Sequence, residues 1–112
     1  MAVTLTKIFP PVQLPGTPAA VLFTFATAGG TLKNLRVRLT NTSATAVPVT
    51  LHVDVAATAS GAGNCCLSAK SIAANDFLDI DIPTMVTGDT LRGFAGTANV
   101  ITMHEIGGTI VT

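Results

Sequence analysis

Residues 47–56 read VPVTLHVDVA, and an apolar side chain with a high strand preference occupies every second position of this stretch. Successive side chains of a β-strand point to opposite faces, so the alternation predicts a strand with one buried and one exposed face. The buried face would hold Val47, Val49, Leu51, Val53 and Val55, and the other face Pro48, Thr50, His52, Asp54 and Ala56. Such a strand needs a second apolar layer opposite it, which favours stacked sheets.

The same period of two recurs in short segments along the chain, and no window of about 11 residues or more shows a convincing helical period. In residues 34–40, for example, Leu35, Val37 and Leu39 would face inward. The expected strands are 3–8, 21–25, 34–40, 47–56, 66–72, 77–82, 90–95, 100–106 and 109–112. We therefore predict one domain, residues 1–112, folded as an antiparallel, jelly-roll-like β-sandwich of about eight strands.

Turn signals separate these strands. Residues 41–46, NTSATA, are expected to close a β-hairpin, and residues 57–64 to form a small-residue loop. Residues 86–89, VTGD, predict a tight turn, and Gly107 with Gly108 a bulge or bend before the last strand.

The N-terminal region, residues 1–18, combines a first strand with a proline-rich segment. Four prolines lie between Phe9 and Pro18, and proline lacks the backbone donor that the interior of a sheet requires. We predict an extended arm or a long loop for this segment.

Charge is sparse, because 11% of the residues are charged against about 25% in an average domain, and six positive side chains balance six negative ones. This balance excludes the basic surface typical of nucleic-acid binding, and no apolar run approaches the roughly 18 residues of a membrane span. Lys7 comes too late and the first prolines too early for a secretory signal, so we expect synthesis and folding in a cytoplasm. A surface of Thr, Ser, Asn and Ala costs little to desolvate, which favours burial in an assembly.

Residues capable of chemistry are few. His52 and His104, with Asp54 or Glu105 nearby in sequence, allow a metal site if their strands are neighbours, but exposed polar positions are the favoured interpretation. Cys65 and Cys66 are adjacent, so their side chains point to opposite faces of a strand.

The favoured interpretation of the two cysteines is a pair of reduced thiols, one in the core and one at the surface. An intersubunit disulfide is the alternative.

The carboxylates of Asp76, Asp79 and Asp81, with Asp89 beyond a turn, lack the spacing of a calcium loop. We interpret them as a solvated or partner-facing edge that discourages strand pairing, with Arg36, Arg38 or Arg92 as candidate partners. Nucleophile elbows and phosphate-binding loops are absent from the sequence, so we expect no catalytic residues, no cofactor and no metal.

Four turn motifs carry a resemblance to a known group of proteins. They are NTS at residues 41–43, IAAND at 72–76, GDTL at 88–91 and ANVITMH at 98–104. Over residues 20–112 the chain resembles small accessory virion proteins of tailed bacteriophages, and most closely the capsid decoration, or cement, proteins. The resemblance implies a jelly-roll-like protein that sits on the capsid as a dimer or trimer and clamps neighbouring major capsid protein subunits, without catalytic residues.

The expected partners are therefore the major capsid protein and further copies of the chain, with the virion as location. Phe9, Val12 and Leu14 would anchor the proline-rich arm on a neighbouring subunit, or the arm would instead be a surface loop closing one end of the sandwich. Thr109, Ile110 and Val111 would form an uncharged edge that pairs with another copy.

Similar proteins also serve as tail, neck or fibre components, so the alternative is a receptor- or carbohydrate-binding β domain. The absence of Trp and Tyr weakens that alternative, since sugars usually stack on aromatic rings. A small jelly-roll metalloenzyme is a third possibility, which two histidines leave short of ligands.

Overall fold

The computed structural model describes residues 2–4, 7–55 and 61–112. Ten strands and one short 3-10 turn make up the regular structure of these residues, and no helix among them is long and apolar enough to cross a membrane. The strands are β1 (Val3–Thr4), β2 (Val12–Gln13), β3 (Ala20–Thr24), β4 (Thr31–Asn41), β5 (Val47–Asp54), β6 (Cys65–Ile72), β7 (Phe77–Asp81), β8 (Met85–Val86), β9 (Thr90–Ala95) and β10 (Ile101–Val111), with the 3-10 turn η1 at Ala62–Asn64. The predicted all-β class is confirmed.

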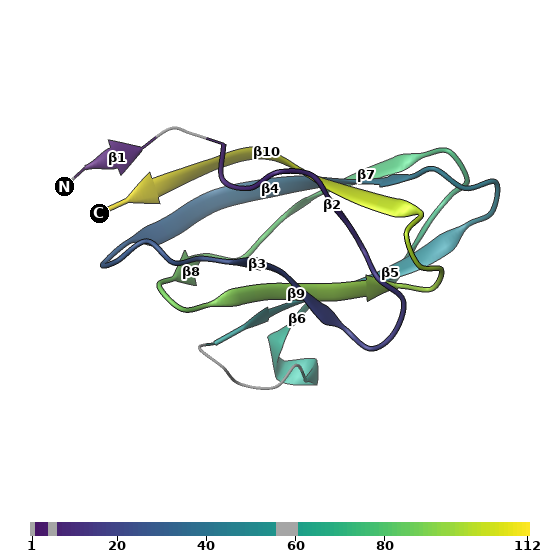
Figure 1. Ribbon diagram of the computed structural model, residues 1–112, viewed down its shortest axis with the longest axis horizontal. Helices are drawn as coiled ribbons and strands as arrows, with labels where there is room; N and C mark the ends of the chain where they lie inside the picture. The colour runs from purple at the N-terminus through teal and green to yellow at the C-terminus, as the bar shows by residue number, and fades with distance from the viewer. Residues whose placement is uncertain (1, 5–6, 56–60) are drawn as a thin grey trace.

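The strands form two antiparallel sheets stacked as layers, as Figure 1 shows. Sheet A has the order β1-β10-β4-β7, with β2 beside β10 and β8 beside β4. Sheet B has the order β3-β9-β5-β6. The predicted antiparallel sandwich is therefore the observed architecture.

Strand pairing follows a nested scheme. β5 pairs with β6, β4 with β7, β3 with β9, and both β1 and β2 with β10, so the chain runs as one long hairpin. Two further pairings, β10 with β4 and β9 with β5, roll this hairpin into two layers. Nested pairing of this kind is the jelly-roll arrangement.

The predicted hairpin at residues 41–46 is wrong. This connection leaves β4 in sheet A and enters β5 in sheet B, so it crosses between the layers. Turn residues show where a chain reverses, but they do not show whether the next strand joins the same sheet. The consecutive strands that pair with each other are instead β5 and β6. Residues 56–60 of the predicted loop between these two strands lie outside the described residues.

The alternation in β5 holds for most of its length and then reverses. Val47, Val49 and Leu51 are buried, but Asp54 is fully buried while Val55 is 57% exposed. The predicted inward position of Val55 and outward position of Asp54 are therefore wrong as statements of burial. β5 ends at Asp54, and the carboxylate lies against Arg92 of the neighbouring strand β9.

Paired irregularities bend sheet A. Leu32 and Leu35 are both buried with two exposed residues between them, and Asn34 adopts φ 57°, a left-handed conformation that Asn tolerates better than most residues. Opposite this point, the register of β10 shifts on both sides of Gly107, which confirms the predicted bulge. β10 continues through it to Val111, so the expected strand at 109–112 belongs to the same strand.

The N-terminal segment passes from one sheet to the other. β1 covers Val3–Thr4, whereas a strand through residue 8 was expected; Leu5 and Thr6 lie outside the described residues. The segment from Lys7 to β3 starts beside β10 in sheet A and ends in sheet B (Figure 1).

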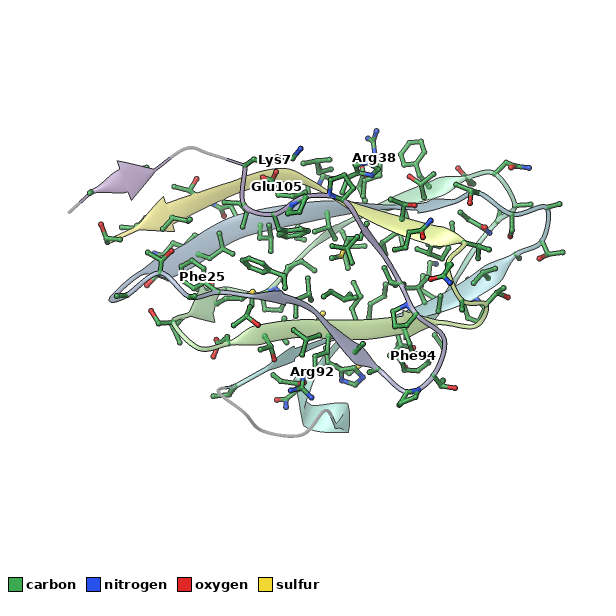
Figure 2. All side chains as sticks on the ribbon, viewed as in Figure 1. Lys7, Phe25, Arg38, Arg92, Phe94 and Glu105 are labelled. Atoms are coloured by element: carbon green, nitrogen blue, oxygen red, sulfur yellow. The ribbon has the colours of Figure 1, made fainter. Side chains whose placement is uncertain are left out.

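The core fills the space between the sheets. Its largest fully buried side chains are Phe25, Leu14, Leu32, Leu35, Leu39, Leu51, Met85, Leu91, Ile101, Met103, Val37 and Val47. Gly93 lets β9 approach β5 closely, because a Cβ atom there would lie 2.6 Å from the Thr50 carbonyl oxygen. Figure 2 shows Phe25 between the layers, and Arg38 and Arg92 on opposite outer sides.

Candidate interaction faces

The outer face of sheet A carries a ladder of ion pairs across β4 and β7. The strand register places Arg36 opposite Asp81, Arg38 opposite Asp79 and Thr40 opposite Phe77. On the other side of β4, His104 of β10 lies opposite Arg38. Basic side chains on β4 thus stand beside acidic side chains on β7.

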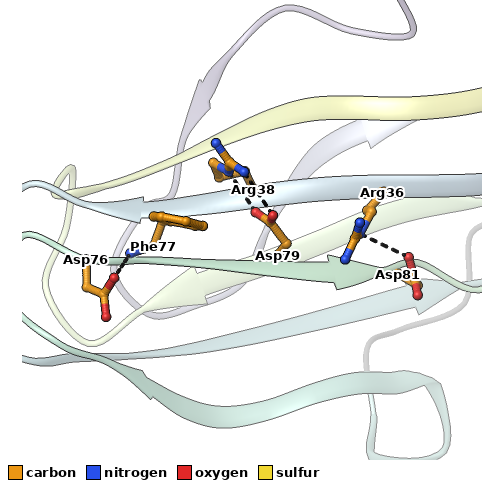
Figure 3. Close-up of polar contacts among 6 residues, drawn as sticks. All are labelled: Arg36, Arg38, Asp76, Phe77, Asp79 and Asp81. Atoms are coloured by element: carbon orange, nitrogen blue, oxygen red, sulfur yellow. Dashed lines mark hydrogen bonds and ion pairs between the residues drawn. The ribbon is translucent and has the colours of Figure 1, made fainter.

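The pair of Arg38 and Asp79 has two parallel hydrogen bonds, shown in Figure 3. Arg38 Nε donates to Asp79 Oδ1 at 2.8 Å and Nη2 donates to Oδ2 at 3.0 Å. These bonds hold the pKa of the Asp79 carboxyl below its usual value. Arg36 Nε lies 3.5 Å from Asp81 Oδ1 in a more exposed pair. The predicted pairing of these carboxylates with Arg36 and Arg38 is confirmed.

Phe77 is the exposed aromatic residue of this face. Its side chain is 51% exposed, and the Arg38 guanidinium lies over the ring with Cζ 4.3 Å from the centroid. A guanidinium at this distance is attracted by the ring electrons. The sequence analysis missed the contact, because it depends on the register between β4 and β7.

β7 is also the edge of sheet A. Asn41 N–H donates to the Asp76 carbonyl, and Ile82 N–H donates to the Leu35 carbonyl. Since hydrogen-bonded pairs recur at every second residue, the backbone groups of Asp79 and Asp81 point toward the open side. The prediction of an acidic edge is confirmed for Asp79 and Asp81, whose charge is a common means of discouraging strand addition. It is wrong for Asp89, which is buried and accepts a hydrogen bond from Val86 N–H through Oδ2 at 3.0 Å.

The outer face of sheet B is nearly free of charge. Strands β3, β9 and β5 contain two charged side chains, Arg92 and Asp54, with Arg92 Nε 3.3 Å from Asp54 Oδ2. His52 lies opposite Arg92, and its Nδ1 is 3.2 Å from the Gly61 carbonyl oxygen. Val21, also opposite Arg92, is 50% exposed. These three strands are therefore neutral around one internal ion pair, and the fourth strand of the sheet, β6, adds the exposed Lys70.

The two histidines lie on different sheets, His52 on β5 and His104 on β10. A metal site shared by both within one chain is thus ruled out by their positions on opposite layers. Within residues 2–4, 7–55 and 61–112, no three His, Cys, Asp or Glu side chains gather closely enough to hold a metal ion.

Cys65 and Cys66 are free thiols in β6. Cys66 packs against the core, its Sγ donates to the Leu51 carbonyl at 3.5 Å, and burial raises its pKa to about 11. Cys65 is half-buried, lies opposite His52, and donates to the Leu67 carbonyl at 3.3 Å. The predicted core thiol is therefore Cys66.

The proposed arm anchors are occupied within the chain. Phe9 is 5% exposed and packs on Phe23 with ring centroids 4.8 Å apart, and Leu14 is fully buried. Val12 is half-buried in β2 beside Met103. In this conformation, Phe9 and Leu14 stabilise the sandwich and present no apolar surface to a partner. The contact of this segment with a partner stays a prediction.

Thr109, Ile110 and Val111 were expected to form an open edge, and that expectation is wrong. They lie in β10, opposite Lys33, Leu32 and Thr31 of β4. On the other side, β1 pairs with Ile110 and Val111. Sequence alone did not show that both ends of the chain meet here.

Three of the four turn motifs meet at one end of the sandwich. The buried side chain of Asn41 donates through Nδ2 to the carbonyls of Thr45 and Ile72, at 2.8 and 3.0 Å, and accepts through Oδ1 from Ser43. Thr42 N–H donates to the Val100 carbonyl at 2.9 Å. These hydrogen bonds tie NTS, IAAND and ANVITMH together, so the motifs hold the fold at this end.

The described residues enclose no cavity of ligand size, because side chains fill the space between the sheets. The available surfaces are thus the two outer faces and the strand edges. No protein-family model, curated protein or solved structure matches this chain.

Proposed function

We propose that this protein is a non-enzymatic structural component of a tailed-phage virion, which decorates the capsid and stabilises it by binding between major capsid protein subunits. The observation that carries the proposal is the low charge of strands β3, β9 and β5 of sheet B, whose two charged side chains, Arg92 and Asp54, are paired with each other. The centres of protein interfaces are depleted of charge, because each charged group must lose water on binding.

The capsid as partner is supported by the resemblance of the turn motifs to accessory virion proteins. Synthesis in the host cytoplasm and location on the virion surface belong to the same proposal. The structure supports a face as the contact surface, because the open edge β7 carries Asp79 and Asp81 and is poorly suited to strand addition.

Stabilisation would follow from mass action. A protein that binds the assembled lattice more tightly than free subunits shifts the equilibrium toward the lattice. A packed sandwich loses little conformational entropy on binding, so more of the contact energy remains as affinity.

The first test is cosedimentation of the purified protein with genome-filled capsids that lack it. We expect saturation on the order of hundreds of copies per capsid, as repetition on a symmetric lattice requires. About a dozen copies or fewer, or binding to tails only, would contradict decoration and favour a neck, tail or fibre role.

A matched pair of variants tests the face. Val21→Lys places a charge on sheet B, and Ile106→Lys places one on β10 of sheet A, at residues that are 50% and 41% exposed. We expect Val21→Lys to weaken capsid binding roughly tenfold or more, because the added charge must be desolvated, while Ile106→Lys binds as the unmodified protein. The reverse result would contradict sheet B as the contact face.

A further inference from the structure

Strand edges differ in their capacity to accept another strand. β3 has a register shift between Val21 and Phe23, and β6 has two shifts along its pairing with β5. β7 presents Asp79 and Asp81. Bulges and charges of this kind obstruct regular pairing, so these three edges are protected.

The C-terminal end of β10 does accept a strand, and in this structure it is the chain's own β1. Val3 lies opposite Val111, and Thr4 lies opposite Ile110. Ala2 and Thr112 exchange two hydrogen bonds, from Ala2 N–H to the Thr112 carbonyl at 2.9 Å and from Thr112 N–H to the Ala2 carbonyl at 2.8 Å. Figure 1 shows both termini side by side at one end of the molecule.

β1 is attached to β10 mainly through backbone hydrogen bonds. Val3 is 57% exposed, so it buries little apolar surface, whereas Phe9 and Leu14 further along are 5% and 0% exposed. Since apolar burial supplies most of the free energy that fixes a segment, the part from Phe9 onward is anchored and residues 2–4 are lightly attached. Terminal segments held by a few ladder bonds open at low cost.

We propose that β1 exchanges between two copies, so that residues 2–4 of each copy pair with Thr109, Ile110 and Val111 of the other. The two copies are identical, so the exchanged strand makes the same backbone hydrogen bonds in the same register. Reciprocal exchange of an identical element is a low-cost route to a two-fold dimer. The dimer fraction rises with protein concentration, and the capsid is not required.

Cysteines introduced in place of Val3 and Val111 can detect the exchange, because a disulfide between them would then link two chains. Because Ala2 and Thr112 form a hydrogen-bonded pair, Val3 and Val111 form the adjacent non-hydrogen-bonded pair, with Cα atoms about 4.5 Å apart. This spacing lies in the range that a disulfide spans. The double variant Val3→Cys, Val111→Cys is made in the full chain, with Cys65→Ser and Cys66→Ala, and oxidised at low micromolar and near-millimolar concentration.

The matched control is Thr40→Cys with Phe77→Cys in the same background. This pair neighbours the hydrogen-bonded pair of Asn41 and Asp76 and joins β4 to β7 inside the rolled hairpin. We expect the control to link within one chain at every concentration, in non-reducing electrophoresis and intact mass measurement.

For the β1 pair we expect a disulfide-linked dimer of twice the chain mass, in a fraction that grows with protein concentration. A link within one chain only, or no link, at the highest concentration overturns the proposal. A chain without residues 1–4 should have the mass of one chain in light scattering at concentrations where the full chain is a dimer. A persistent dimer of the shortened chain also overturns it, because another surface would then hold the copies together.

Discussion

On sheet A, Arg36 and Arg38 meet Asp81 and Asp79 at the surface, whereas on sheet B Arg92 meets a fully buried Asp54. The first pairs are the more exposed ones, with 43% of the Arg38 side chain and 54% of the Arg36 side chain accessible, so solvent screens them more strongly and they contribute less to stability. The second pair has lost much of its water, so each partner depends on the other. The same type of cross-strand Arg–Asp pair therefore keeps the surface of sheet A polar, whereas in sheet B it stabilises the fold.

Removing one carboxylate from each face should give the largest difference. We expect Asp54→Ala to lower the free energy of unfolding by about 3 kcal/mol, because Arg92 loses its partner in a dehydrated setting. Asp79→Ala leaves Arg38 without its partner, but the Arg38 side chain is 43% exposed and water can hydrate it, so the effect should be several times smaller. Chemical denaturation of the two variants measures this difference, and equal losses would contradict the contrast between the faces.

Lowering the pH should reveal the contribution of the Arg38–Asp79 pair of sheet A to the free energy of unfolding. The folded-state pKa of Asp79 is lowered by Arg38, so its stabilisation is complete above the usual aspartate pKa of about 3.9. The contribution is lost as pH falls through the lower folded value. We expect Asp79→Asn to flatten the acid limb of stability against pH, measured from denaturation midpoints. An unchanged acid limb would show that the pair does not form in solution.

The last prediction compares the chemical reactivity of two thiols on opposite sides of sheet B, Cys65 and Cys66. It concerns the rate of modification and not the stability of the fold. With a pKa of about 11, the Cys66 thiol is about one-thousandth ionised at pH 8, and it is packed against the core. We expect an aromatic disulfide reagent to modify Cys65 first and Cys66 only on unfolding. The single variants Cys65→Ser and Cys66→Ala assign the two phases. Rapid modification of both thiols in the folded chain would contradict the inward position of Cys66.

Local features of the fold were predictable from the sequence, because they depend on neighbouring residues. The inward face of Leu35, Val37 and Leu39, the span of β9 and the bulge at Gly107 were all confirmed. Each depends on alternation or on a glycine within a few residues.

Features that join distant parts of the chain were not predictable. The burial of Asp54 requires Arg92, 38 positions later, and the buried position of Phe9 requires Phe23 across the sandwich. A proline-rich segment has no period from which an inward face can be recognised. The crossing of residues 41–46 between sheets depends on pairing with β7 and β10, which lie far along the chain.

The nested hairpin has a consequence for the order of folding. β4 lies between β7 and β10, so the centre of sheet A is incomplete until the last strand has been synthesised. Closing such distant pairings costs chain entropy before the contacts stabilise the product, which makes all-β folds of this kind slow to form. A growing chain of this protein would therefore leave the ribosome with β4 still lacking its neighbour β10, and chaperone binding would matter most during that interval.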